Sequence, residues 1–365
     1  MSQDSQKTEA QRLDPLRQKI DELDQALLDL LSKRAAVALE VGHVKEEFGS
    51  VVYRPEREQQ VLDKVANKNL GPLKKAGIQA IWREIMSACR AIEASTTIAY
   101  LGPAGTFSEE ATLAFFGHSV ELSPCQSLDD IFRQVESGQS QYGVVPIENS
   151  SEGAISRTLD LLLESPLLVT GEISIPVRHT LMSLSGNLEG ITHVLAHPQA
   201  LAQCQQWLNQ FAPKLHREAI SSNAQAALEA SKNPQYAAIA SRSAVQTYGL
   251  KTVKESIQDD AHNRTRFVVI GHHAASSTGK DQTSLILSVK NEAGAVYRLL
   301  EPFAQHSVSM TRFESRPARK GSWEYHFYID IDGHQGDASV AKALEELKNM
   351  TAFYKCLGSY PKSEH

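Results

Sequence analysis

Apolar residues in the N-terminal segment recur every three or four positions, which predicts one long amphipathic helix. The stripe consists of Leu16, Ile20, Leu23, Leu27, Leu30, Val37, Val41 and Val44. Asp14 and Pro15 supply the expected N-cap and first helical residue, and no breaker follows before Gly49. A helix over 15–48 spans about 50 Å, whereas a compact domain of this size measures about 30 Å across. One chain cannot bury the stripe, so we expect an all-helical module in which two chains pair their long helices.

Two shorter helices are expected next, after Pro55 and Pro72. One face of the second helix carries Ile78, Ile81, Ile85, Cys89 and Ile92. Its spacing of three and four residues is that of an amphipathic helix packed against a neighbour. These helices complete a first domain, predicted to span 1–95.

From Thr96 onward, short β-rich runs alternate with capped helices, the pattern of α/β architecture. The expected strands are 98–101, 142–146, 167–175, 191–196, 236–239 and 267–270. Thr106 to Glu109 and Ser127 to Asp130 are typical helix-capping sequences. Loops that carry the sequence motifs described below follow strands in both halves of this segment. We therefore expect two lobes with a cleft between them over 96–273.

A small, polar, glycine-containing segment, 274–280, is predicted to be a linker. The segment that follows, 281–365, has the order βαββαβ, which is typical of a ferredoxin-like α+β domain. Its strands are expected at 284–289, 308–313, 325–331 and 353–357, and its helices at 295–305 and 339–349.

Composition narrows the class of protein. With 365 residues, 41% of them hydrophobic and 22% charged, the chain is an ordinary globular protein of two or three domains. Its net charge of -6 argues against nucleic-acid and membrane partners, so cations for an anionic ligand must be local. No apolar run approaches the roughly 18 residues of a membrane span, the N-terminus lacks the hydrophobic segment of a secretory signal, and the four cysteines form no C-x-x-C pair. We therefore expect a cytoplasmic protein with free thiols and no metal site.

Arg34 occupies a position in the first helix where the spacing predicts an apolar side chain. A cation in such a place needs an anionic partner. Arg17, Lys45 and Arg57 lie close to the same helical faces. The partner is either an anionic ligand or an internal salt bridge on a solvated, charged helix, and the spacing alone leaves both open.

Four motifs accompany these cations: R-x-x-I-D-x-L-D from Arg17, L-L-x-x-R ending at Arg34, V-G-H-V-K ending at Lys45, and R-P-E-R-E from Arg54. In this order they resemble the all-helical class of chorismate mutase over residues 13–94. The resemblance implies rearrangement of chorismate to prephenate. That reaction involves no proton transfer, so the protein has only to hold the reactive conformer and stabilise charge on the ether oxygen.

The resemblance gives substrate-binding or catalytic roles to Arg17, Arg34, Lys45, Arg57, Glu58, Cys89 and Glu93. The arginines would hold the two carboxylates, with Arg17 reaching in from the second chain. Lys45 would face the ether oxygen and Glu58 the ring hydroxyl. Glu93 stands where some relatives have glutamine, and Arg54 where they have aspartate. Because Glu93 donates a hydrogen bond only when protonated, mutase activity is expected to favour lower pH.

The central segment carries Y-L-G-P-A-G-T-F-S-E-E-A at 100–111, V-V-P-I-E-N-S-S-E-G-A-I at 144–155, A-H-P-Q-A-L-A-Q-C at 196–204 and N-R-T-R-F at 263–267. Each motif alone is compatible with ordinary turns and helix caps. Together and in this order they closely resemble prephenate dehydratase over 97–272. The resemblance implies loss of hydroxide and carbon dioxide from prephenate, which requires a donor for the departing hydroxyl and anchors for two carboxylates.

By this resemblance Thr265 is the donor to the leaving oxygen. Arg266 would grip a carboxylate or brace the loop. Glu148, Asn149 and Gln203 would line the cleft. A threonine hydroxyl is a weak acid, so its role is hydrogen-bond donation rather than full proton transfer.

Two segments of the last domain resemble the phenylalanine-binding segments of ACT domains appended to prephenate dehydratases. They are Gly294, Ala295 and Val296 at a helix start, and Glu314, Ser315, Arg316 and Pro317 at the end of a strand. Ordinary turn chemistry is the alternative interpretation. In the family the two segments meet across a dimer interface. Tyr297 departs from a common Gly-Ala-Leu-Val pattern and would reshape the pocket.

The three resemblances imply a bifunctional enzyme that converts chorismate to prephenate and then to phenylpyruvate, inhibited by phenylalanine. It would need no cofactor or metal and would act as a homodimer or higher oligomer. Two alternatives remain: a dehydratase that prefers arogenate, and a catalytically inactive phenylalanine sensor. The retained Arg34, Lys45 and Thr265 argue against the sensor.

Overall fold

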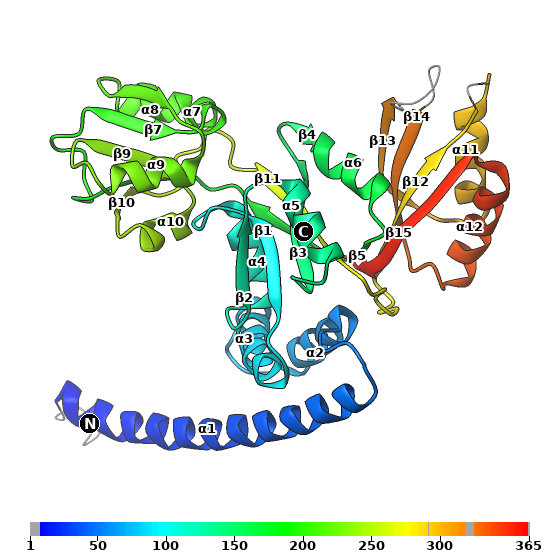
Figure 1. The fold of residues 1–365 in the computed structure, drawn as a ribbon. Helices are drawn as coiled ribbons and strands as arrows, with labels where there is room; N and C mark the ends of the chain where they lie inside the picture. The colour runs from blue at the N-terminus through cyan, green and yellow to red at the C-terminus, as the bar shows by residue number, and fades with distance from the viewer. Residues whose placement is uncertain (1–7, 291, 318–324, 364–365) are drawn as a thin grey trace, which may run out of the picture.

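The computed structural model describes residues 8–290, 292–317 and 325–363. The outermost parts of the predicted first and last domains, 1–7 and 364–365, lie outside the described residues. Figure 1 shows a long N-terminal helix along one side, a central pair of lobes, and a C-terminal sheet with helices on its outer face. No helix in the described part of the chain is long and apolar enough to cross a bilayer.

The N-terminal helix α1, Glu9–Glu47, begins six residues earlier than predicted. Thr8 and Gln11 form a capping box, in which each side chain bonds the other residue's backbone N–H. Pro15, expected at the first helical position, therefore lies inside the helix. The earlier capping pair outcompetes Asp14 because it satisfies two free backbone N–H groups at once.

Almost all of α1 is exposed, and Gly42 is its only fully buried residue. A side chain at Gly42 would meet Glu93 at 3.1 Å, so the absence of one allows α1 to approach α3 closely. The apolar stripe of α1, from Leu16 to Val44, remains uncovered in one chain, as the length of the helix predicts.

Two shorter helices complete the first module, α2, Pro55–Lys68, and α3, Lys75–Glu93. Pro55 takes the first helical position of α2, where its missing N–H costs no hydrogen bond. Both helices turn an apolar face toward the rest of the chain, burying Leu62, Met86 and Cys89.

The first lobe of the central module is a mixed sheet in the order β2-β1-β3-β11-β5, with β4 paired to β3. Its strands are β1 (Thr97–Leu101), β2 (Glu121–Cys125), β3 (Tyr142–Asn149), β4 (Gly153–Ala154), β5 (Leu168–Pro176) and β11 (Arg264–Gly271). Its helices are α4 (Phe107–Phe116), α5 (Leu128–Glu136) and α6 (Ser156–Glu164). Strand β11 runs antiparallel between β3 and β5, which brings residues from distant parts of the sequence together.

The second lobe is a sheet in the order β10-β6-β9-β7-β8. Its strands are β6 (Thr180–Ser183), β7 (His193–Ala196), β8 (His216–Ala219), β9 (Tyr236–Ala240) and β10 (Lys251–Lys254). Its helices are α7 (Pro198–Gln203), α8 (Gln205–Phe211), α9 (Asn223–Ala230) and α10 (Arg242–Thr247). The chain enters this lobe after β5 and returns through β11, so two connections join the lobes (Figure 1).

The C-terminal module is an antiparallel sheet in the order β13-β14-β12-β15. Its strands are β12 (Asp281–Ser288), β13 (Met310–Pro317), β14 (Tyr325–Asp332) and β15 (Phe353–Pro361), and its helices are α11 (Ala295–Gln305) and α12 (Ala338–Met350). The helices cover one face. The other face contributes Ile286, Tyr328 and Leu357 to the core of the first lobe. The predicted fold, with helical, two-lobed α/β and ferredoxin-like modules, is confirmed.

Candidate active sites

A cavity of about 730 Å³ lies between α1, α2 and α3. Six of the seven residues predicted for the first module line it: Arg34, Lys45, Arg57, Glu58, Cys89 and Glu93. Arg54, the departure noted in the sequence, lines it as well. With Lys33 and Arg90, which also line it, the cavity combines six cations with two carboxylates, which suits an anionic ligand that also offers a hydroxyl group.

Short contacts hold several of these side chains. Arg34 donates from Nη1 to Cys89 Sγ at 2.7 Å. Lys45 donates to the Glu93 carboxylate at 2.7 Å and to the carbonyl of Val52 at 2.8 Å. The close approach of α1 to α3 makes the Lys45–Glu93 ion pair possible.

Glu58 is paired with Arg90, a cation that the sequence analysis did not single out. Arg90 is almost fully buried, and its second guanidinium nitrogen donates to the carbonyl of Phe116 at 2.5 Å. Burial raises the pKa of Glu58, and the charge of Arg90 opposes that rise. Arg90 was missed because its carbonyl partner belongs to the next module.

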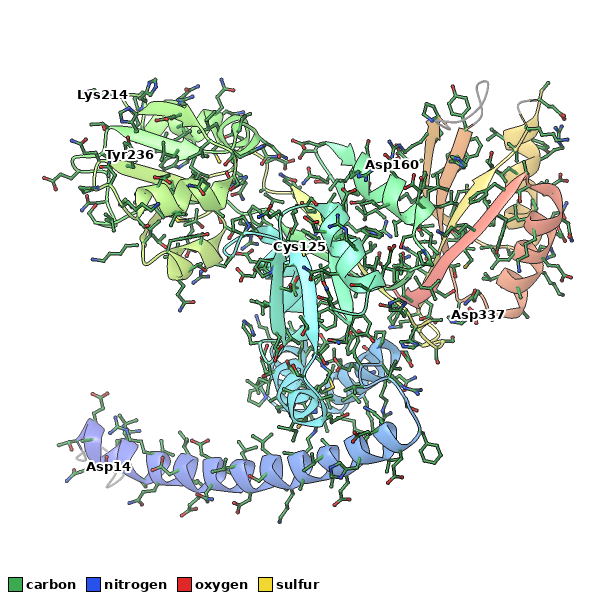
Figure 2. All side chains as sticks on the ribbon, in the orientation of Figure 1. Asp14, Cys125, Asp160, Lys214, Tyr236 and Asp337 are labelled. Carbon is green, nitrogen blue, oxygen red and sulfur yellow. The ribbon has the colours of Figure 1, made fainter. Side chains whose placement is uncertain are left out.

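Arg17 does not line the cavity of its own chain. It is exposed and lies 3.6 Å from Asp14, which Figure 2 labels near the N-terminal end of α1. Seventeen residues separate it from Arg34, which is about 25 Å along a helix. Only an Arg17 from another chain can reach this cavity.

A second cavity, of about 430 Å³, lies between the two lobes of the central module. Thr265, Asn149 and Gln203 line it, as predicted. Thr265 on β11 pairs in register with Asn149 on β3. Asn149 Nδ2 donates to Thr265 Oγ1 at 2.9 Å and to Asn263 Oδ1 at 3.0 Å. Because Thr265 accepts this bond, its own hydroxyl hydrogen is free to point to a ligand.

The polar lining of this cleft is mostly uncharged. Among the described residues that line it, Glu152 and His179 have ionisable side chains, and there is no lysine or arginine. Gln203 Oε1 lies 2.8 Å from His179 Nε2. Burial lowers the pKa of His179, so the ring is neutral and suited to orienting the Gln203 amide. The starts of α4, α6 and α9 also border the cleft and add partial positive charge.

Glu148 and Arg266 lie outside this cleft. Side chains alternate between the faces of a strand, so the neighbours of Asn149 and Thr265 point to the C-terminal module. Arg266 binds Glu172 and Asp330, each at 2.7 Å, and lies 3.9 Å from Glu148. The expected cleft contacts of Glu148 and Arg266 are corrected accordingly, and the bracing alternative for Arg266 agrees with its position.

A third cavity, of about 380 Å³, lies at the start of α11. Gly294, Ala295, Val296 and Ser315 line it, together with Tyr297. Gly294 has φ +77°, a left-handed conformation that favours glycine.

The other three predicted residues of this site do not line that cavity within one chain. Arg316 points to the opposite face of the sheet, where it binds Asp160 of α6 at 2.9 Å. Figure 2 labels Asp160 on the side of α6 that faces the C-terminal strands. Glu314 lies two residues before Arg316 in the strand, so its side chain points to the same face as that of Arg316. Pro317 is the last residue of the strand, at the edge of the sheet. Their predicted contact with a ligand therefore depends on a neighbouring chain.

Three family models match consecutive parts of the chain. They are described as Chorismate mutase type II, matching residues 16–94, Prephenate dehydratase, matching 98–275, and ACT domain, matching 283–349. The first two matches contain the two cavities between helices and between lobes, and the third contains the cavity at α11.

Full-length relatives and solved structures agree with these family matches. A bifunctional chorismate mutase/prephenate dehydratase of Neisseria gonorrhoeae (strain ATCC 700825 / FA 1090) is 46% identical over 95% of this chain and 96% of that protein. The structure of prephenate dehydratase from Arthrobacter aurescens in complex with L-Phe has a TM-score of 0.68 and 32% identity, covering 73% of this chain and 90% of that one. A structure described as GqqA, a novel type of quorum quenching acylase, has a TM-score of 0.67 and 28% identity, covering 73% and 98%.

Fold and matches together define a fused enzyme with separate mutase and dehydratase modules and a C-terminal ACT domain. The chain belongs to the family of bifunctional chorismate mutase/prephenate dehydratases. It is both an isomerase and a carbon-oxygen lyase of phenylalanine biosynthesis. Because the acylase shares the fold, the roles of individual residues must be argued from the sites themselves.

Proposed function

We propose that the cavity between α1, α2 and α3 is the chorismate mutase site. Arg34 and Arg57 bind substrate carboxylates, Lys45 faces the ether oxygen, and Glu58 accepts a hydrogen bond from the ring hydroxyl. The observation that carries this assignment is that one cavity gathers these four side chains. Fixing the substrate and stabilising charge are sufficient for the rearrangement, because no proton is transferred.

A second chain completes this site in our proposal. Arg17 cannot reach the cavity of its own chain, and the apolar stripe of α1 is uncovered. Antiparallel pairing of two α1 helices buries both stripes and carries Arg17 of each chain toward Arg34 of the other. The enzyme is therefore at least a homodimer.

The cleft between the lobes is proposed as the prephenate dehydratase site, with Thr265 as hydrogen-bond donor to the departing hydroxyl. The bond from Asn149 carries this assignment, because it occupies the acceptor side of Thr265 and leaves its hydrogen for the leaving oxygen. As that oxygen departs, the carboxylate leaves as carbon dioxide and the ring becomes aromatic. The amides of Asn149 and Gln203 and the helix starts anchor the carboxylates without a cation.

Prephenate is the proposed substrate rather than arogenate, because the fused mutase module produces it. The four cysteines are free thiols, which fits the reducing conditions of the cytosol, where we propose that the enzyme works.

Phenylalanine is the proposed inhibitor, bound at the ACT cavity beside Gly294. The start of α11 offers backbone N–H groups to a carboxylate. The sheet of the ACT domain shares a core with the first lobe of the dehydratase, so a change in its packing reaches the dehydratase lobe directly. The Arthrobacter relative, whose structure is a complex with L-Phe, supports the choice of ligand.

One assay tests the pair of activities. Purified protein is given chorismate, and chorismate, prephenate and phenylpyruvate are followed with and without phenylalanine. We expect prephenate to rise first and phenylpyruvate to follow, with phenylalanine slowing the second step. Absence of both products across a range of pH would instead support the inactive sensor.

A further inference from the structure

Arg90 of α3 joins the mutase cavity to the dehydratase module. One nitrogen of its guanidinium group pairs with Glu58 Oε1. The other donates at 2.5 Å to the carbonyl of Phe116, the last residue of α4. The guanidinium carbon lies 4.8 Å from the centre of the Tyr53 ring, a distance suited to cation–π attraction.

The end of α4 is well suited to hold this cation. Carbonyl groups at a helix C-terminus have no partner in the helix and carry partial negative charge. Phe116 presents such a carbonyl, and α4 stops there because Gly117 turns the chain at φ +79°. A side chain at Gly117 would meet Ser87 of α3 at 2.5 Å, so the glycine permits the close approach on which the contact depends.

Further contacts fix α3 against the turn after α4. The backbone N–H of His118 donates to Glu84 at 3.1 Å, and the ring of His118 lies 2.8 Å from the same carboxylate. The backbone N–H of Ser119 donates to Ser87 at 3.1 Å. Arg90 is therefore held in a rigid junction between the two modules.

We propose that Arg90 is a positioning residue for chorismate rearrangement, which keeps Glu58 charged and oriented through an anchor supplied by the dehydratase helix α4. The proposal deepens the mutase function and rests on the role assigned to Glu58. Arg90 also lines the cavity, but we place its action through Glu58, because Nη1 is engaged by Glu58, Nη2 donates to the carbonyl of Phe116, and Nε is buried. Its pairing with Oε1 leaves Oε2 of Glu58 for the ring hydroxyl.

The charges around Glu58 determine what loss of Arg90 would do. They are Arg83, Arg90 and Glu93 of α3, Tyr53 and Arg54 before α2, Glu56 and Arg57 of α2, Lys33, Arg34 and Lys45 of α1, Tyr142 of β3, Glu172 of β5, and Lys362 after β15. Arg90 is the cation in direct contact with the carboxylate. Without it, burial raises the pKa of Glu58 further, so the carboxyl group is protonated at pH values where the native enzyme keeps it ionised.

The test uses the full-length enzyme with Arg90→Leu, and follows mutase kcat/KM from pH 5 to 9 with chorismate. A single opposite charge shifts a carboxyl pKa by about 1 to 3 units, so we expect the loss of activity relative to the native enzyme to reach about tenfold or more toward pH 5 and to shrink as the pH rises. Dehydratase activity with added prephenate serves as a folding control in the same chain. Arg90→Lys, which keeps the charge but not the two-armed geometry, should recover part of the activity.

The variant Glu58→Gln distinguishes failure of the role assigned to Glu58 from failure of the role proposed for Arg90. If Glu58→Gln leaves the mutase unchanged, the role of Glu58 is wrong. If Glu58→Gln is impaired but Arg90→Leu retains the native pH profile with a normal dehydratase, Arg90 is not a positioning residue. If Arg90→Leu loses both activities, the experiment is repeated with Arg90→Gln. Glutamine keeps N–H donors but carries no charge. Loss of both activities in that variant too would overturn the proposal of a local effect on Glu58.

Discussion

Thr265 and Arg266 are consecutive residues of β11 whose side chains lie on opposite faces of the sheet. Thr265 accepts a hydrogen bond from Asn149 in the cleft between the lobes. Arg266 binds Asp330 of the ACT domain and Glu172 of β5. One strand thus carries the proposed donor on one side and a buried ionic contact with the ACT domain on the other.

Replacing Thr265 by alanine removes the proposed donor without touching the mutase cavity. We expect phenylpyruvate formation to fall by about 100- to 1000-fold, while prephenate accumulates from chorismate. The measurement is the rate of both steps in one preparation. Thr265→Ser, which keeps the hydroxyl group, should retain much of the activity. An equal loss of both activities would indicate a shared site or misfolding.

Filling the ACT cavity tests the regulatory site more cleanly than removing the domain. Truncation after Lys280 would uncover the core that Leu159 and Val169 share with the ACT sheet. Ser315→Tyr should instead occupy the cavity and raise the phenylalanine concentration needed for half-inhibition by at least about tenfold, through the loss of contacts worth over about 1.4 kcal/mol. Ser339→Tyr, at an exposed position of the same domain, is the matched control.

The comparison is the dehydratase rate against phenylalanine concentration for the two variants and the native chain. Equal inhibition of all three would move phenylalanine binding away from Gly294 and Ser315. Loss of basal dehydratase activity in Ser315→Tyr would show that the substitution disturbs the shared core.

Mixed dimers test whether the Arg17 of each mutase site comes from the partner chain. Arg17→Ala and Arg34→Ala chains should each be inactive as mutases, because each removes a carboxylate anchor from every site. When the two chains are folded together, the Arg34→Ala chain supplies Arg17 to the intact Arg34 of its partner. One site per mixed dimer should then work. Demonstrated heterodimers with no mutase activity would contradict the shared site.

Glu93→Gln tests how the second donor operates. A glutamine amide can donate a hydrogen bond, whereas the Glu93 carboxylate, paired with Lys45, accepts one, so the variant should have a higher mutase kcat/KM than the native enzyme. The substitution also releases Lys45, which is held by Glu93 at 2.7 Å, for the ether oxygen. The measurement is the mutase kcat/KM of the variant and of the native enzyme under the same conditions. Equal values would exclude position 93 as the place of the second donor.

Regular spacing made much of the fold predictable. The stripe from Leu16 to Val44 predicted a long helix with an uncovered face, and the βαββαβ order predicted the ACT sheet. Five strands, β2, β4, β6, β8 and β10, were not predicted. Three of them are polar edge or near-edge strands such as His216–Ala219, in which little apolar alternation is visible.

The sites were predictable where a motif places side chains on one face. Lys45 and Glu58 line one cavity because helices α1 and α2 fix the direction of their side chains. Arg266 was misplaced because a motif of consecutive residues does not reveal which side of a strand each one occupies. Arg90 gave no signal, since its partner is a backbone carbonyl that any residue could supply.

Helix α4 connects the two enzyme modules physically, because it contacts both active sites. Its first turn borders the dehydratase cleft, and its last carbonyl, about 15 Å away, holds Arg90 against Glu58. A chimera that grafts this mutase module onto a foreign dehydratase would lose that carbonyl unless the graft also carried α4 and its glycine turn. In the proposed mechanism the mutase module depends on this contact with the dehydratase module, so substitutions at Ser87, Arg90 and Gly117 should occur together among relatives.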